Sequence, residues 1–179
     1  MKKTVLVLSL IVFTNVLFAQ TKKTTSATVA FDATTALDAL PKAENKTVIA
    51  EIDTQTGQIG FEAAVKNFTF PKPTIQEHFN EERWLNSNKY PAFTFMGKIS
   101  EVTKYNFSNN GIYNVTVTGQ LTIKDKTNNI TTSATIEVKN GTLVAAATFT
   151  IVLADYGVQV GNSGKIAGEP KITVSAELK

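Results

Sequence analysis

Strict alternation of apolar and polar residues is the feature of this sequence that most narrows its fold. Between residues 113 and 124, apolar side chains occupy every second position and polar ones fill the positions between them. The apolar positions are Tyr113, Val115, Val117, Gly119, Leu121 and Ile123. Only a β-strand turns successive side chains to opposite faces, so this segment predicts a long strand with one apolar face.

The same two-residue period recurs along most of the chain. Apolar positions alternate within segments 27–31, 48–52, 59–65, 93–99, 130–138, 143–153 and 172–178. Asn140-Gly141 between two of these segments is typical of a type I′ hairpin, in which both turn residues take positive φ. We also expect turns at residues 55–57 and 125–129. With the strand at 113–123, the pattern predicts an all-β protein of about eight strands.

Consecutive hairpins with one apolar face can form a barrel or a sandwich, and a membrane barrel has the same period. The polar face carries charges suited to bulk water, at Lys124, Glu137, Lys139 and Glu177. The aromatic residues do not gather into two girdles, and the chain ends in Leu178-Lys179 without a terminal aromatic residue. These features oppose a membrane barrel, and they leave open an antiparallel barrel or a sandwich in water.

Residues 1–19 have the pattern of a secretory signal peptide. Lys2 and Lys3 precede an apolar run from Val5 to Phe18, and Ala19 supplies a small residue for cleavage. The run is short for a membrane span, which needs about 20 residues. We therefore expect a mature, single-domain chain of residues 20–179, periplasmic or secreted, with no stable transmembrane span.

Composition argues against several kinds of functional site. The chain has no cysteine, which excludes disulfides, thiol nucleophiles and cysteine–metal sites, and it has one histidine, His78. No second ligand stands at metal-binding spacing from His78, so we expect it to form structural hydrogen bonds. The net charge of +3 comes from dispersed cations rather than the basic patch that nucleic-acid binding requires. The sequence predicts no catalytic residues, metal, cofactor or nucleic-acid partner.

One segment interrupts the alternation. Residues 74–87 contain a short helical pattern, in which Ile75 and Phe79 are four residues apart and share one face. Thr74 and Glu77 have the spacing of a capping box, which predicts that Thr74 is the N-cap. We expect this helical insert to cover one end of the barrel, where a lid could control access.

Three segments resemble motifs of the YceI-like family. The first motif is Gln76–Phe95. In it, His78-Phe79 aligns with the family's His-Leu pair, and Trp84-Leu85 aligns with its aromatic pair. Tyr90-Pro91 then precedes a strand of alternating phenylalanines. The second is the strand GQLTI, residues 119–123, and the third is FTIVLADYGV, residues 149–158. The resemblance covers residues 26–179. One departure is Leu153, where many family members carry an arginine.

The resemblance implies an antiparallel, lipocalin-like β-barrel of about eight strands. Such a barrel holds an amphiphilic lipid, an isoprenoid quinone or polyprenyl compound, for storage or transport in the cell envelope. The residues alone leave two alternatives open: small side chains such as Gly97, Gly119 and Ala134 leave an empty lumen, or Phe and Trp fill the space beside them. A filled core would suit a structural or stress-linked envelope protein that acts through protein contacts. A homodimer is also left open. The residues expected to line the lumen and its mouth are Phe31, Phe61, Val65, Phe79, Trp84, Phe93, Phe95, Val117, Leu121, Ala145, Ala147 and Phe149.

Overall fold

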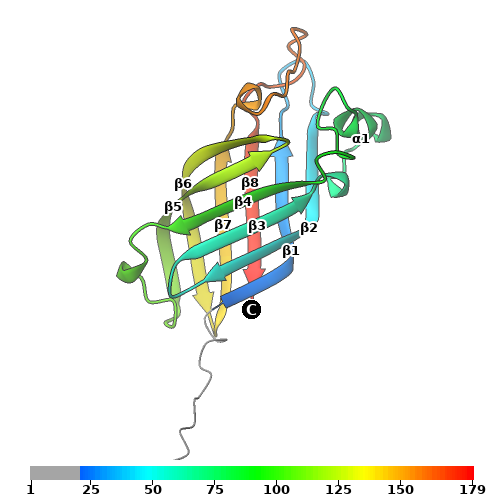
Figure 1. The fold of residues 1–179 in the computed structure, drawn as a ribbon. Helices are drawn as coiled ribbons and strands as arrows, with labels where there is room; N and C mark the ends of the chain where they lie inside the picture. Colours follow the sequence, from blue (N-terminus) through cyan, green and yellow to red (C-terminus); the bar gives the residue numbers. More distant parts are fainter. Residues whose placement is uncertain (1–20) are drawn as a thin grey trace, which may run out of the picture.

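The computed structural model describes residues 21–179, which form one closed antiparallel barrel (Figure 1). Neighbouring strands in the barrel are neighbours in sequence, and β1 closes it by pairing with β8. The strands are β1 (Thr21–Asp32), β2 (Lys42–Asp53), β3 (Gln58–Ala64), β4 (Ala92–Ile99), β5 (Gly111–Ile123), β6 (Lys126–Lys139), β7 (Thr142–Thr150) and β8 (Lys171–Leu178). The all-β, eight-stranded prediction is confirmed. The predicted signal peptide lies outside the described residues.

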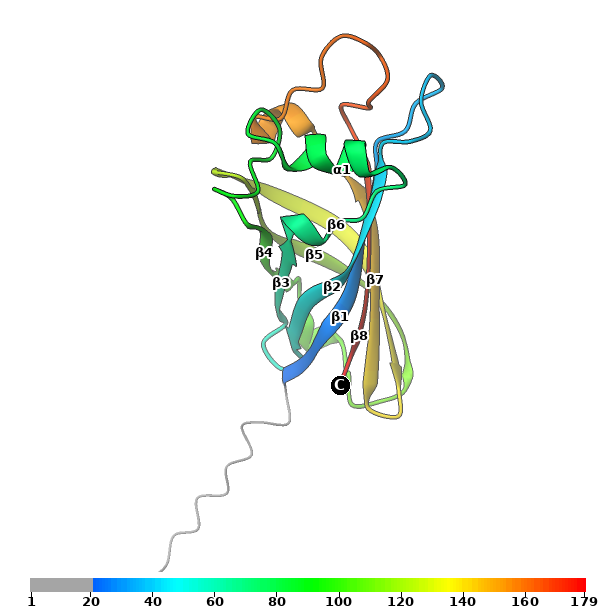
Figure 2. The same ribbon diagram turned by 90° about the vertical axis from the view of Figure 1, so that its right-hand side faces the viewer.

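Short helices connect some of the strands. They are α1 (Pro73–Asn80) and the 3-10 helices η1 (Val65–Asn67), η2 (Val102–Lys104) and η3 (Leu153–Tyr156). Figure 2 shows α1 and η3 at the same end of the barrel, opposite the C-terminus; we call this the α1 end. Within residues 21–179, none of the helices has the length and apolarity needed to cross a membrane.

The apolar face of each strand points into the barrel, as the alternation predicts. Along β5, Val115 and Val117 are buried, whereas Asn114 and Thr116 between them are exposed. A buried core therefore runs through the inside of the barrel and includes Ile52, Ile99, Ile136 and Leu178.

The two turns around β6 gave different outcomes. Asn140 and Gly141 have φ of 51° and 80°, which confirms the predicted positive-φ hairpin turn. The turn expected at 125–129 is present but shorter and earlier, at residues 124–125, because β6 already begins at Lys126, directly opposite Ile123. Thr127 pairs with Thr122 across the strands, and their hydroxyls are 2.8 Å apart. Polar residues on both faces concealed the start of this strand.

Three strand ends also differ from the sequence prediction. β1 begins at Thr21 rather than near Ala27, because its polar first residues pair with the last residues of β2. Val65 and Leu153 were expected to continue strands, but they lie in η1 and η3. In η1 the Val65 amide donates to Pro91 O at 2.8 Å, outside the β3–β4 ladder, which ends at Ala64.

The helical insert is shorter than predicted, and its cap is different. Pro73 is the first residue of α1 and Lys72 is the N-cap, with no side-chain cap hydrogen bond. Thr74 therefore lies inside the helix, so the capping-box prediction is wrong. Proline is favoured at the first helical position. An amide N–H at that position would have no acceptor within the helix, so its absence costs no hydrogen bond. Turns and bends follow α1 as far as Tyr90.

Candidate functional site

The barrel encloses an apolar cavity, which we call the lumen. Its volume is about 160 Å³, and its wall includes residues from all eight strands, α1, η3 and the loops at the α1 end. Thr94 and Thr132 are the only Ser, Thr, Asn, Gln or charged residues in this wall. A cavity of this composition favours an apolar occupant and offers nothing to stabilise a charged one.

The structure brings the predicted lining residues together, with one exception. The residues that line the lumen are Phe31, Phe61, Phe79, Trp84, Phe93, Phe95, Val117, Leu121, Ala145, Ala147 and Phe149. Val65 does not line it, because η1 turns this fully buried side chain into the surrounding core. Whether these residues bind a ligand stays a prediction.

Several lumen residues were missed from the sequence. Phe68 is buried, with its ring centroid 5.9 Å from that of Phe79 and 5.7 Å from that of Phe93. Ile151 and Val158 reach the lumen from the segment after β7, where the chain is no longer a strand. The alternation of Phe68 and Phe70 is a sequence signal from which Phe68 could have been predicted. Val158 lies in a loop, where no periodic pattern indicates which way a side chain points.

The glycines of the lumen face do not leave the space expected of them. Gly97 and Gly119 are opposite each other on β4 and β5. A Cβ atom at Gly97 would lie 2.5 Å from Phe95 Cζ, and one at Gly119 would lie 2.6 Å from the same atom. The Phe95 ring therefore covers both glycines, and at this position the filled-core alternative is correct.

The alanines behave differently. Ala134, Ala145 and Ala147 are inward-facing and line the lumen, yet each remains only partly buried. Ala134 is opposite Ala147 across the β6–β7 ladder, so two methyl groups face the cavity where larger side chains would close it. These alanines therefore border the lumen on the β6 and β7 side without filling it.

The size of the lumen limits what it can hold without rearrangement. An apolar cavity of about 150 Å³ is known to accept benzene. The 160 Å³ lumen therefore accommodates a group of about one aromatic ring. A longer chain requires side chains such as Phe61 and Phe149, both partly buried, to change position.

An aromatic cluster closes the lumen beneath α1. Phe79, on the inner face of the helix, has its ring centroid 4.8 Å from that of Phe70 and 6.2 Å from that of Phe31. Trp84 and Leu85 follow α1 and also reach the lumen. The position expected for the insert, across one end of the barrel, is therefore confirmed (Figure 2).

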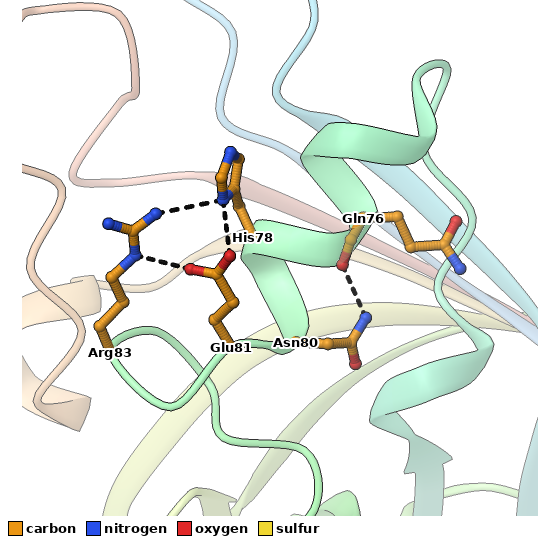
Figure 3. A network of polar contacts seen from close by, with 5 residues as sticks. All are labelled: Gln76, His78, Asn80, Glu81 and Arg83. Carbon is orange, nitrogen blue, oxygen red and sulfur yellow. Dashed lines mark hydrogen bonds and ion pairs between the residues drawn. The ribbon is translucent and has the colours of Figure 1, made fainter.

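Polar groups on the outer side of α1 form a small network (Figure 3). His78 Nδ1 lies 2.9 Å from Glu81 Oε1, and Arg83 Nε donates to Glu81 Oε2 at 2.7 Å. The hydrogen bond from His78, supported by the Arg83 charge, holds the pKa of Glu81 below its usual value. The side chains of His78 and Arg83 are 56% and 68% exposed, so this network fixes the turn after α1 at the surface.

Among residues 21–179, no group of three or more His, Asp or Glu side chains is placed to hold a metal ion. In the described part of the chain, Asn80 Oδ1, at the last residue of α1, is buried and accepts no hydrogen bond, although Asn80 Nδ2 donates to Gln76 O at 2.8 Å.

The chain belongs to the YceI-like family, whose YceI-like domain model matches residues 11–178. The match begins inside the predicted signal peptide and includes the whole barrel. No curated protein sequence matches the chain.

Solved structures share the fold at low sequence identity. A polyisoprenoid-binding domain from Saccharophagus degradans, implicated in plant cell wall breakdown, superimposes with a TM-score of 0.75 and 11% identity, covering 90% of this chain and 98% of that one. BcnA from Burkholderia cenocepacia gives a TM-score of 0.68 and 18% identity, covering 86% of this chain and 96% of BcnA. A mutant YCEI protein from Campylobacter jejuni with a monobromobimane guest superimposes with a TM-score of 0.59 and 14% identity, covering 100% of this chain and 99% of that one.

Proposed function

We propose that this protein binds the prenyl chain of an amphiphilic lipid, an isoprenoid quinone or polyprenyl compound, in the barrel lumen. The observation that carries the proposal is a lumen without a charged residue in its wall, in a chain of the YceI-like family. The S. degradans neighbour is described as a polyisoprenoid-binding domain, which supports the same class of ligand.

The energetics favour an apolar chain. Each methylene-sized group moved from water into the lumen contributes about 0.8 kcal/mol, so even partial enclosure of a prenyl chain gives useful affinity. The same wall could not stabilise a charged transition state, because it offers neither charged groups nor paired acid and base. We therefore assign a binding role and no catalytic one.

A structural protein with a filled core is the second candidate. The Phe95 ring over Gly97 and Gly119 favours it, as does the modest free volume of 160 Å³. A core that is already packed needs no ligand for stability. Under this alternative, the surface rather than the lumen would carry the function.

Organic extraction separates the two candidates. Protein purified from its native host without detergent is extracted, and the extract is analysed by mass spectrometry. The binding role predicts a prenyl lipid at a near-stoichiometric amount. Extracts with no prenyl lipid, from protein that also fails to take up an added prenyl quinone, would support the filled core.

We also propose that the protein acts in the periplasm or outside the cell. Lys2, Lys3, the apolar run up to Phe18, and Ala19 support export with cleavage after Ala19. N-terminal sequencing of the exported protein is then expected to begin at Gln20 or close to it. An exported chain that still carries Met1 would contradict this proposal.

A further inference from the structure

β6 and β7 are paired along only part of their length. Their ladder joins Ala134–Lys139 to Thr142–Ala147 and ends where Ala134 faces Ala147. Past this point β6 continues beside β5 to Lys126, and β7 continues beside β8 to Thr150. The two strands diverge toward the α1 end, as Figure 2 shows, so the barrel wall forks between them.

β2 and β3 also diverge, but protein fills the gap between them. Their ladder is confined to Ile49–Ile52 and Ile59–Glu62. Beyond it, the fully buried Asn45 donates its Nδ2 hydrogen to Ala64 O at 2.9 Å, and Phe68 is buried with only 2% of its surface exposed. Opening the barrel on this side would break this partly buried hydrogen bond and expose a phenylalanine.

At the apex of the fork between β6 and β7, the wall is made of small residues. A surface groove lies over this apex, with Asn114, Thr116, Ser133, Thr135 and Thr148 among its lining residues. The groove also reaches Ala134 and Ala147, which line the lumen as well. Small alanine side chains therefore separate the outer groove from the inner cavity.

The wide end of the fork is covered by η3, whose Leu153 and Tyr156 are buried, so passage through the fork requires η3 to move with the strands. Asn128 Nδ2, on β6, donates to Asp155 O at 3.1 Å. Near the apex, the Thr132 hydroxyl donates to Ser133 O of its own strand at 3.2 Å, instead of reaching across to β7. An exposed hydrogen bond of this kind contributes about 1 kcal/mol, which is small beside a strand ladder.

We propose that the fork between β6 and β7 is a lateral portal through which an apolar chain passes into and out of the lumen. The proposal rests on the proposed lipid-binding function. A long chain exceeds the 160 Å³ lumen, so its uptake requires the lumen to rearrange, and the fork is where the strands can separate without loss of a ladder pair. Separation of the strands beyond Ala134 breaks no β6–β7 ladder pair, whereas separation of β5 from β6 would break a ladder that extends from Gly111 to Ile123.

The absence of cysteine from the chain allows the groove to be blocked at one chosen position. Thr148→Cys places a thiol in the groove, where a bulky polyethylene-glycol maleimide can be attached. Thr173→Cys is the matched control, because Thr173 is the exposed cross-strand neighbour of Thr148 on β8 and lies outside the groove. The measurement is the rate at which each labelled protein takes up a dansyl-farnesyl probe, followed by its fluorescence.

Labelling at Thr148→Cys is expected to slow uptake about tenfold without changing the amount bound at equilibrium, since the block acts on passage. Labelling at Thr173→Cys is expected to leave the rate unchanged. Ser133→Cys, on the other side of the groove, provides a second variant and should slow uptake in the same way when labelled. Circular dichroism checks that all three remain folded.

Equal rates for the Thr148 and Thr173 adducts, with normal equilibrium binding, would overturn the portal while leaving the proposed function intact. A Thr148→Cys thiol that resists the reagent would also overturn it, because the groove would then be closed. If the unlabelled parent protein takes up no probe at all, the proposed function itself fails.

Discussion

At the scale of single residues, a small side chain does not by itself predict a cavity. Gly97, Gly119 and Ala147 are all small and all belong to the inward face of the barrel. The glycines lie under the Phe95 ring, whereas Ala147 borders free volume. Sequence alternation gives the direction of a side chain, but the rotamer of a neighbouring phenylalanine decides whether the space beside it is filled.

Gly119→Ala tests this close packing. A Cβ atom there would lie 2.5 Å from Gly97 Cα and 2.6 Å from Met96 O, so backbone as well as the Phe95 ring must shift. We expect a loss of about 1–3 kcal/mol in the free energy of unfolding, measured by urea denaturation.

Gly168→Ala is the control for that substitution. A Cβ atom at Gly168 meets no atom within 4 Å, and its φ is outside the positive range that disfavours alanine. Its free energy of unfolding should therefore stay close to that of the parent protein. Equal stability of the two variants would show that the β4–β5 contact is looser than the structure indicates.

At the scale of elements, the strands were more predictable than their ends. The alternation within β5 arises because one face of the strand is buried, and the apolar residue types show which face that is. The first residues of β6, Lys126–Asn129, carry no apolar face, so only pairing with β5 makes them a strand. Likewise, α1 begins at Pro73 because proline favours the first helical turn, and this outweighed the capping pattern of Thr74 and Glu77.

The insert around α1 gives the element-scale prediction. Trp84 is the only tryptophan of the chain and lines the lumen, so its fluorescence reports on this end of the barrel alone. We expect a prenyl quinone to quench or shift Trp84 emission in a saturable way, because the chain would pack against the indole ring.

His78→Ala accompanies this titration as a variant of the same insert. His78 is exposed and contacts Glu81 and Arg83 rather than the lumen, so the affinity for the quinone should stay within about twofold of the parent value. Loss of all binding in a folded His78→Ala variant would show that the histidine recognises the lipid head group. Unchanged Trp84 emission during demonstrable uptake would place the bound chain away from the insert.

At the scale of the whole molecule, closure of the barrel was predictable and the occupancy of its lumen was not. Repeated hairpins with one apolar face favour closure, because closure pairs every strand edge. Occupancy depends on how Phe31, Phe61, Phe95 and Phe149 pack against one another inside. The structure gives an intermediate answer: the Phe95 ring fills the space over the glycines of β4 and β5, and a cavity of about 160 Å³ remains, bordered by the alanines of β6 and β7 among others.

Ala147→Trp tests whether that free volume serves a ligand. If the lumen binds a prenyl chain, tryptophan should occupy the same space, so that quinone binding is lost while the melting temperature changes little. If the core is in effect already filled, overpacking should instead cost about 1–3 kcal/mol and lower the melting temperature. Val144→Trp is the matched control, because Val144 lies on the same strand with 37% of its surface exposed and should leave both properties unchanged. Thermal melts beside quinone titrations of the two variants distinguish the outcomes: a large loss of melting temperature in Ala147→Trp with no specific loss of binding would contradict a lumen that binds lipid.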